Sequence, residues 1–314
     1  MAYSKKDKAF TLIELLVVIS IIALLLSILV PSLSKAKQMA QFVLCGSNIK
    51  QLVLAEALYT SENDGKYSNG MIAFSLPYSE SVPQITDRSM SGADADCRWH
   101  DERYNNDNRH DLWGQIWPYL ENQEVVLCPV FKKLAKKVGQ FHSGSHNPDI
   151  PVDPQYSYSK NIWLGNPSKY YDGIWPWATE YEAPRETNVR SPATVFMFAE
   201  ENLWTTTMPE YSQLEGTTIN WNAASINDNA LFSIWQGPQT GVDCFATYHK
   251  TSWDSPEQMM AGMYNAVFAD GHLETVLNYA TTGSNYRNYI SEPRNCIRRS
   301  DPRGWYKKVY RSGP

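Results

Sequence analysis

An uninterrupted apolar run from Phe10 to Val30 constrains this chain more than any other feature of its sequence. At about 1.5 Å per residue, a helix over this run is just long enough to cross a hydrocarbon core about 30 Å thick. Glu14 is the only charged residue in the run. An ionised carboxylate inside a membrane costs roughly 2.5 to 3.5 kcal/mol on insertion scales. The sequence therefore predicts a transmembrane helix over residues 10–30 whose carboxylate needs a partner.

The segment before the apolar run has the charge of a leader but lacks the features of an ordinary secretory signal. Three lysines (Lys5, Lys6 and Lys8) come first, and the small residue Ala9 directly precedes Phe10. No Ala-x-Ala cleavage site follows the apolar run, so we expect the helix to be retained and residues 1–9 to form the leader peptide. The excess of lysines predicts a single-pass protein of the cytoplasmic (inner) membrane, with a cytoplasmic N-terminus and an exported C-terminal domain.

The residues from Lys8 to Ile19 read KAFTLIELLVVI and resemble the N-terminal signal of type IV pilins and type II secretion pseudopilins. Pro31 stands where that family has a helix bend. The resemblance implies that a prepilin peptidase cuts between Ala9 and Phe10 and methylates the new amino group. It also implies that Glu14 guides filament assembly. Ala9 departs from the family, which normally has glycine before the cut.

The same resemblance implies a set of partners and a fate for the chain. The partners are prepilin peptidase, other pilin or pseudopilin subunits contacted through the N-terminal helix, the inner-membrane assembly platform and the lipid bilayer. After assembly the subunit would belong to a filament at the cell surface or in the periplasm. The size and large loops of the chain favour a minor subunit, while pilus and secretion system remain open alternatives.

Beyond Pro31 the apolar pattern becomes amphipathic and predicts that the helix continues over residues 31–62. Turn-forming residues at Glu62–Gly65 then end it. Pro31 and Gly46 are both unfavourable inside a helix and are candidate bends. The residues that recur at three- and four-residue steps and define one buried stripe are Phe42, Cys45, Ile49, Leu52, Val53 and Tyr59.

Residues 63–314 have the composition of an exported globular domain that is rich in β-structure. Short apolar segments alternate with Gly, Pro, Asn and Asp, which favours strands joined by long loops and little helix. The fold class we expect is α+β and pilin-like, with an antiparallel sheet packed on the amphipathic part of the helix. The predicted strands are Gln123–Cys128, Tyr156–Leu164, Ala193–Ala199, Asn265–Phe268 and His272–Leu277.

Scattered motifs extend the resemblance to the large pilin-like proteins of planctomycete and lentisphaeral bacteria. The motifs are Cys45–Leu52, Trp113–Leu120 with the following Cys128-Pro129, Tyr156–Tyr158 and Phe268–His272. That subfamily often has a histidine nine residues before an Asp-Gly pair. Here the nearest upstream histidine is His249, much further from Asp270, so no role tied to that spacing is carried over.

The chain has five cysteines on the side that we expect to be exported, where disulfides persist. The odd number leaves at least one cysteine free or paired with another molecule. Cys45 lies on the buried helix stripe and Cys128 precedes Pro129, and we pair these two in a possible disulfide. Two buried free thiols are the equal alternative.

The remaining polar motifs give no positive sign of catalysis, and we expect no enzyme, no catalytic residues, no cofactor and no bound metal. Asp270 and Gly271, followed by His272, are typical of a hairpin turn, and a metal role for them would need converging partners. His142 and His146 lie among loop residues. Residues 94–111 are favoured as a solvated loop, with a calcium site as the alternative. The oxygen and imidazole ligands there are Asp94, Asp96, His100, Asp101, Glu102, Asp107, His110 and Asp111.

Charge excludes a general affinity for nucleic acid, because the chain has a net charge of −5 and its basic residues are enriched near the N-terminus. The basic C-terminal stretch Arg294–Arg311 contains Trp305, Tyr306 and Tyr310, and we interpret it as a surface tail. The sequence thus predicts a non-enzymatic filament subunit. The alternative is a membrane-anchored cell-surface protein whose aromatic-rich domain binds polysaccharide or another anionic ligand, and a secreted hydrolase is a third.

Overall fold

The structure is a computed structural model. It describes residues 11–70, 73–74, 114–120, 122–138, 154–161, 164–165, 185–189, 192–203, 205–207, 218–220, 230–231, 246–251 and 261–279. The chain divides into two compact units, Met1–Val43 and Leu44–Pro314. Helix α1 (Leu12–Glu62) begins in the first unit and ends in the second.

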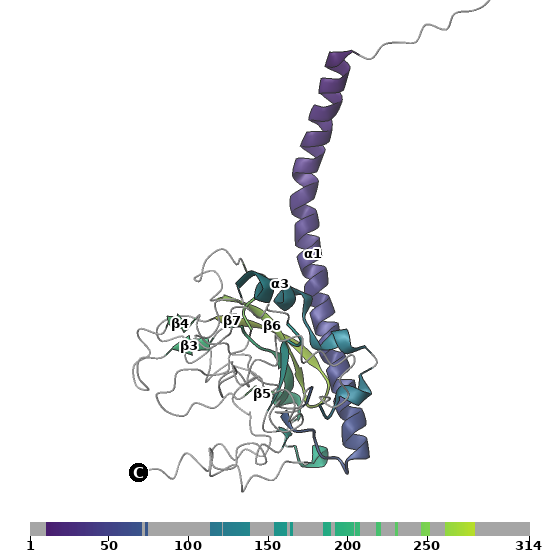
Figure 1. The fold of residues 1–314 in the computed structure, drawn as a ribbon, viewed down its shortest axis with the longest axis vertical. Coiled ribbons are helices and arrows are strands. Elements are labelled where there is room, and N and C mark those ends of the chain that lie inside the picture. The colour runs from purple at the N-terminus through teal and green to yellow at the C-terminus, as the bar shows by residue number, and fades with distance from the viewer. Residues whose placement is uncertain are drawn as a thin grey trace, which may run out of the picture. The chain divides into compact units, whose positions relative to one another are not determined.

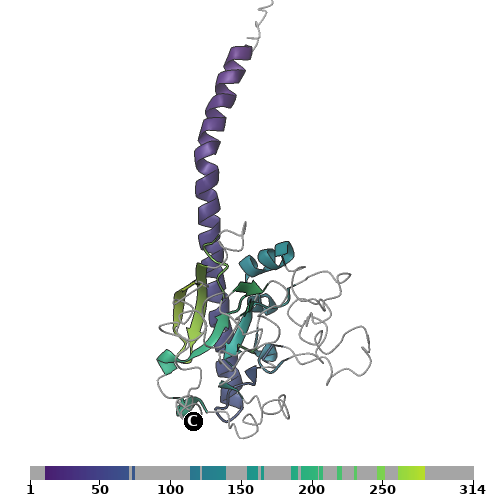
Figure 2. The same cartoon turned by 90° about the vertical axis from the view of Figure 1, so that its left-hand side faces the viewer.

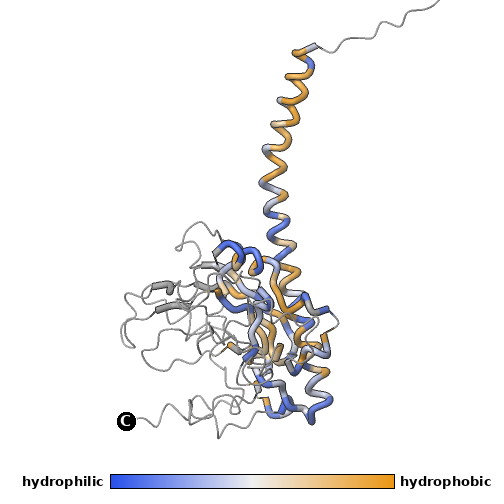
Figure 3. The backbone as a smooth tube through the Cα atoms, viewed as in Figure 1, coloured by the Kyte–Doolittle hydropathy of each residue, from blue (hydrophilic) through white to orange (hydrophobic). Residues whose placement is uncertain are grey.

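The first half of α1 is predominantly apolar over residues 12–30 and mixed in polarity over residues 31–40, which include Lys35 and Lys37. Every residue from 11 to 40 is exposed, and Figure 3 shows mostly hydrophobic colour along the part of α1 furthest from the sheet. Within the described part of the chain, α1 is the one helix whose length and apolar composition are sufficient to cross a membrane. The helix continues through Pro31 without a break, and a bend at this residue stays a prediction.

The second half of α1 buries a stripe that largely follows the predicted one. Cys45, Ile49 and Leu52 are fully buried, while Phe42, Val53 and Tyr59 are only partly buried. The helix ends at Glu62, where Gly65 adopts a φ of 74° and its amide donates to the carbonyl of Thr60. The complete set of buried residues in α1 is Cys45, Gly46, Asn48, Ile49, Leu52, Ala55, Glu56 and Thr60.

A five-stranded sheet in the order β5-β1-β2-β6-β7 packs on this stripe. Its neighbouring strands are antiparallel, except that the short edge strand β5 pairs parallel to β1. The α+β, pilin-like fold class is therefore confirmed. The strands are β1 (Tyr158–Asn161), β2 (Phe196–Glu200), β5 (Ala230–Leu231), β6 (Ala261–Phe268) and β7 (Leu273–Tyr279), and a separate two-stranded sheet joins β3 (Thr205–Thr207) to β4 (Thr218–Asn220).

The strand predicted at Gln123–Cys128 is wrong. The segment forms a 3₁₀ helix, η6 (Gln123–Val126), because the Asn122 side chain accepts a hydrogen bond from the amide of Glu124 and caps it. The helix α3 (Pro129–Val138) follows, with proline at its first position. The other 3₁₀ helices in the described residues are η5 (Trp117–Tyr119), η10 (Glu186–Asn188) and η11 (Pro192–Thr194).

Close packing between α1 and the β6–β7 hairpin explains the glycine inside the helix. A Cβ atom on Gly46 would lie 3.0 Å from the Cδ2 atom of Leu273. Gly46 costs about 1 kcal/mol of helix stability relative to alanine, but it allows the hairpin to approach the helix. Both ribbon views show β6 and β7 beside the second half of α1 (Figure 1, Figure 2).

Candidate functional site

Glu14 forms a capping box with Thr11 at the start of α1. The Glu14 carboxylate accepts hydrogen bonds from the backbone amide and the hydroxyl of Thr11, both at 2.9 Å. In return the amide of Glu14 donates to the Thr11 hydroxyl at 3.2 Å. This reciprocal arrangement satisfies two amides that the first turn of a helix leaves without partners. The carboxylate therefore has hydrogen-bond partners within its own chain.

Sequence reasoning identified Glu14 but missed Thr11, although the Thr-x-x-Glu spacing before an apolar run is the signature of a capping box. The other residues of the N-terminal signal are placed as follows. Ala9 and Phe10 lie outside the described residues, and Pro31 lies in the exposed half of α1. The described part of the signal is thus a capped helix start followed by an apolar surface.

In the globular domain, the structure joins the two cysteines that the sequence analysis paired. A disulfide links Cys45 on α1 to Cys128, which directly precedes α3, with a Cα–Cα distance of 5.3 Å. The Ser157 hydroxyl accepts a hydrogen bond from the amide of Cys128 at 2.7 Å, and the Tyr158 hydroxyl donates to the carbonyl of Cys45 at 3.3 Å. Cys97, Cys244 and Cys296 lie outside the described residues.

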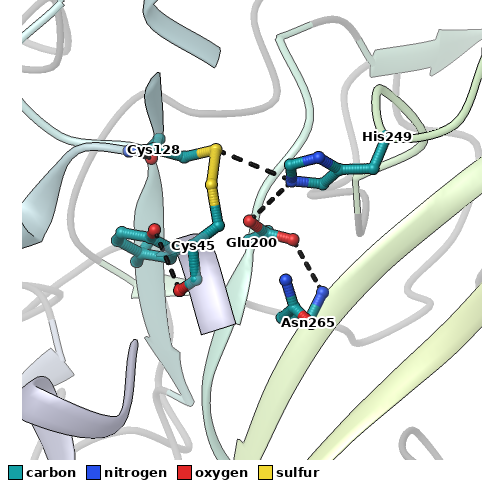
Figure 4. The surroundings of a disulfide bond; sticks show 7 residues. Cys45, Cys128, Glu200, His249 and Asn265 are labelled. Atoms are coloured by element: carbon teal, nitrogen blue, oxygen red, sulfur yellow. Dashed lines mark hydrogen bonds and ion pairs between the residues drawn. A yellow bond between two sulfur atoms is a disulfide. The ribbon is translucent and has the colours of Figure 1, made fainter. Parts of the chain in front are cut away.

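A buried imidazole and a buried carboxylate lie beside this disulfide (Figure 4). The Nε2 atom of His249 is 2.8 Å from Oε1 of Glu200 and 3.6 Å from Sγ of Cys128. The second carboxylate oxygen of Glu200 accepts a hydrogen bond from the amide of Asn265 at 2.6 Å. Glu200 and both cysteines are fully buried, and His249 is 2% exposed. The four side chains come from four separate segments, and all are of a type that ligates metal ions.

A second buried charged group, which the sequence analysis also missed, connects α1 to strand β1. The ammonium of Lys160 lies 2.7 Å from a carboxylate oxygen of Glu56, and both residues are fully buried. Lys160 also donates to the carbonyl and the hydroxyl of Ser68, whose own amide donates to Glu56. Burial lowers the pKa of Lys160, and the attraction of Glu56 opposes this change. The group stabilises the contact between helix and sheet only while both partners are present.

Asp270, Gly271 and His272 lie at the turn between β6 and β7. Only Gly271 has a positive φ, of 86°, so the loop differs from a two-residue turn with two positive φ values. The Nδ1 atom of His272 lies 2.5 Å from Asp270, its Nε2 atom lies 3.3 Å from Glu274, and the imidazole stacks on Phe268. These partly exposed side chains support the hairpin, and they lie apart from the Glu200–His249 pair.

The other sites that the sequence raised lie outside the described residues. These are the acidic segment 94–111 with its calcium alternative, His142 and His146, and the basic stretch at residues 294–311. Their roles stay predictions.

Comparison with known proteins gives matches that cover only part of the chain. The family model of the prokaryotic N-terminal methylation motif matches residues 4–30. The type IV wide pilus major component PilA4 of Thermus thermophilus is 34% identical over 82 residues, which cover 26% of this chain and 63% of the relative. The chain therefore spans less than two thirds of the length of this relative. No solved structure matches the chain. Together with the long apolar helix and the sheet packed on its second half, these matches support a type IV pilin-like protein, on the evidence of part of the chain.

Proposed function

We propose that this protein is a non-enzymatic subunit of a type IV pilus-like or type II secretion pseudopilus filament. The observation that carries the proposal is the segment of α1 over residues 12–30, which is predominantly apolar, is exposed throughout and begins within the methylation motif. An apolar surface of this extent requires a nonaqueous environment. A bilayer provides it before assembly, and the equivalent helices of other subunits provide it in a filament.

Glu14 can satisfy its charge within its own chain and, in a filament, through a second donor from a neighbouring subunit. In the single chain its carboxylate accepts hydrogen bonds from Thr11. A carboxylate has about four acceptor positions, so it can also accept from a second donor. In a filament, that donor is the amino group created by cleavage before Phe10 in a neighbouring subunit. Because burial of both charges offsets much of their attraction, the pair fixes register more than it adds net stability.

Substitution of Glu14 by leucine tests the proposal. Glu14→Leu leaves the amino group of the neighbour buried without a partner, which costs about 3 to 5 kcal/mol, so incorporation into filaments should fall sharply. Insertion into the membrane should be retained, since the variant removes a charge from the span. The matched control is Ser20→Leu, which also converts an exposed polar residue of α1 to leucine and should assemble normally.

The measurement is the amount of each variant in membranes and in sheared filaments of the native host, together with the intact mass of the chain. A mature chain that begins at Phe10 with an N-methyl group supports processing by prepilin peptidase. Equal incorporation of Glu14→Leu and parent, at equal membrane levels, would contradict the role of Glu14. Absence of the parent from filaments, with binding to cell-surface polysaccharide, would replace the proposal with the membrane-anchored binding protein.

A further inference from the structure

We propose that Cys45, Cys128, Glu200 and His249 form a zinc site when the two cysteines are in the thiol state. Their ligand atoms, two Sγ, one carboxylate oxygen and one imidazole nitrogen, all lie within 4.8 Å of one another, and all four residues are buried. The disulfide is then the oxidised, metal-free form of the same site. This inference does not depend on filament assembly.

The distances in the cluster approach those of a tetrahedral ion, apart from the two sulfurs, which are bonded to each other and have to separate on reduction. Zinc binds sulfur at about 2.3 Å and nitrogen or oxygen at about 2.0 to 2.2 Å, so its ligand atoms are separated by roughly 3.3 to 3.8 Å. The 3.6 Å between Sγ of Cys128 and Nε2 of His249 already lies in this range. The 2.8 Å between His249 and Glu200 has to widen by about half an ångström. Two thiolates, one imidazole and one carboxylate are a ligand set that suits zinc.

The residues around the cluster hold the ligands as a metal site requires. One oxygen of Glu200 faces His249, and the other accepts the amide hydrogen bond of Asn265, which fixes the orientation of the carboxylate. The backbone of Cys128 is fixed by its hydrogen bond to Ser157. Such partners of ligands typically change metal affinity by about 10- to 100-fold. A zinc ion would also supply positive charge to the buried carboxylate and to the two thiolates that form when it binds.

The disulfide form converts to the zinc form in two steps, a thiol–disulfide exchange and then the deprotonation of the two cysteine ligands. A dithiol donates two electrons and two protons to the Cys45–Cys128 bond, which breaks to give two thiols while the dithiol becomes a disulfide. Zinc then displaces the two thiol protons, which leave to solvent, and binds the thiolates. A newly synthesised chain does not need the exchange step, because its cysteines are still thiols. Zinc thus replaces the disulfide as the cross-link between α1 and the segment before α3.

The test uses the full chain in detergent micelles with Cys97, Cys244 and Cys296 replaced by serine, so that the proposed ligands supply every thiol. After reduction with a phosphine in the absence of oxygen, the chain is titrated with cobalt(II) and then with zinc. We expect one cobalt per chain, with the visible bands of a tetrahedral ion and the charge-transfer absorption of thiolate ligands, and displacement by zinc. Zinc should also raise the unfolding midpoint of the reduced chain, whereas the oxidised chain should bind no metal.

Variants of Glu200 and His249 distinguish a four-ligand metal site from metal binding by the two thiols alone. Glu200→Gln and His249→Gln should each weaken cobalt binding at least about tenfold. The control Glu201→Gln changes the adjacent buried glutamate, which lies outside the cluster and contacts Ser159, and should bind cobalt like the parent. Equal affinity in Glu200→Gln, His249→Gln and the parent would overturn the proposal. If those variants do not fold, the parent chain alone provides the test. Failure of the reduced parent to bind one cobalt per chain, or to show thiolate absorption, would equally overturn the proposal.

Discussion

The two halves of α1 share one continuous helix but differ in what surrounds their side chains. In the first half, residues 11–40 are all exposed, whereas the second half buries a stripe from Cys45 to Thr60 against the globular domain. The apolar segment of the first half therefore needs only apolar side chains and no particular order of them. A membrane or a bundle of similar helices surrounds the segment with apolar groups on all sides. The second half is specified by position, since each buried residue faces a particular strand or loop. Substitutions of one apolar residue by another should accordingly leave the stability of the domain unchanged in the first half and be costly at the buried positions of the second half.

The largest effect is expected where the second half contains a buried charge. Lys160→Met leaves the Glu56 carboxylate of α1 buried without its partner and should lower the free energy of unfolding by about 3 to 5 kcal/mol. The double variant Glu56→Leu/Lys160→Met should recover much of this loss. Lys132→Met, on the exposed face of α3, is the control. Denaturant unfolding of the full chain in detergent measures all three. Equal stability of Lys160→Met and Lys132→Met would show that the buried pair is dispensable.

A matched leucine pair tests the comparison directly. Leu52 is fully buried and Leu24 is 64% exposed, although both lie in the same helix. Leu52→Ala should cost the domain about 2 to 5 kcal/mol of unfolding free energy through loss of packing and formation of a cavity. Leu24→Ala should leave domain unfolding unchanged. The same denaturation experiment measures both variants. Similar losses of unfolding free energy in Leu52→Ala and Leu24→Ala would contradict the distinction between the two halves.

Removal of the Cys45–Cys128 disulfide should have a somewhat smaller effect. The bond closes a loop with a sequence separation of 83, and its loss should destabilise the domain by about 2 to 4 kcal/mol. Cys128→Ala, unfolded in the presence of a chelator, measures this effect in a background that lacks the other three cysteines. Peptide mapping without reduction checks the pairing independently. Recovery of Cys45 and Cys128 as alkylated thiols from oxidised protein would reject it.

The smallest effect belongs to the β6–β7 turn and depends on pH. Partial burial acts to lower the pKa of His272, but its hydrogen bonds to Asp270 and Glu274 outweigh this and raise it. For Asp270, partial burial acts to raise the pKa, and the bonds from His272 outweigh it and lower the pKa. The stabilisation is therefore present between about pH 4 and 6.5, is lost as pH rises through the raised His272 pKa, and is lost as pH falls through the lowered Asp270 pKa.

Replacement of His272 by alanine measures this contribution. Because the three side chains are about one third exposed, solvent screening should limit the loss to a few tenths of a kcal/mol. Unfolding curves of parent and variant should differ most near pH 5 and converge in alkaline solution. A difference that grows with rising pH would contradict the sign of the His272 shift.

The sequence was sufficient to predict features that depend on local pattern. The apolar run, the end of α1 near Glu62 and the buried positions Cys45, Ile49 and Leu52 all follow from periodicity and turn chemistry. Helix α3 was missed, although apolar residues alternate with lysine pairs along it in a helical pattern. The buried residues of α3 are Val130, Phe131, Leu134 and Ala135.

The buried polar groups were harder to predict, because they depend on how distant segments meet. Nothing in the local sequence of Lys160 or Glu200 distinguishes them from exposed residues of a strand. Glu56 did carry a signal, since it continues the helical spacing of Ile49 and Leu52 and therefore lies on the buried face despite its charge. A charged residue in phase with an apolar stripe predicts a buried partner of opposite sign, even where the sequence does not identify that partner.

The cross-link at Cys45 also determines how the domain responds to mechanical load. Cys45 is the second residue of the domain unit, which begins at Leu44, so tension along α1 enters the domain almost at this residue. With the bond to Cys128 formed, the pull passes covalently to the segment before α3. The Glu56–Lys160 pair, three helical turns further along, carries less of the pull. We therefore expect tension along α1 to load the Cys45–Cys128 bond before the helix residues that follow it.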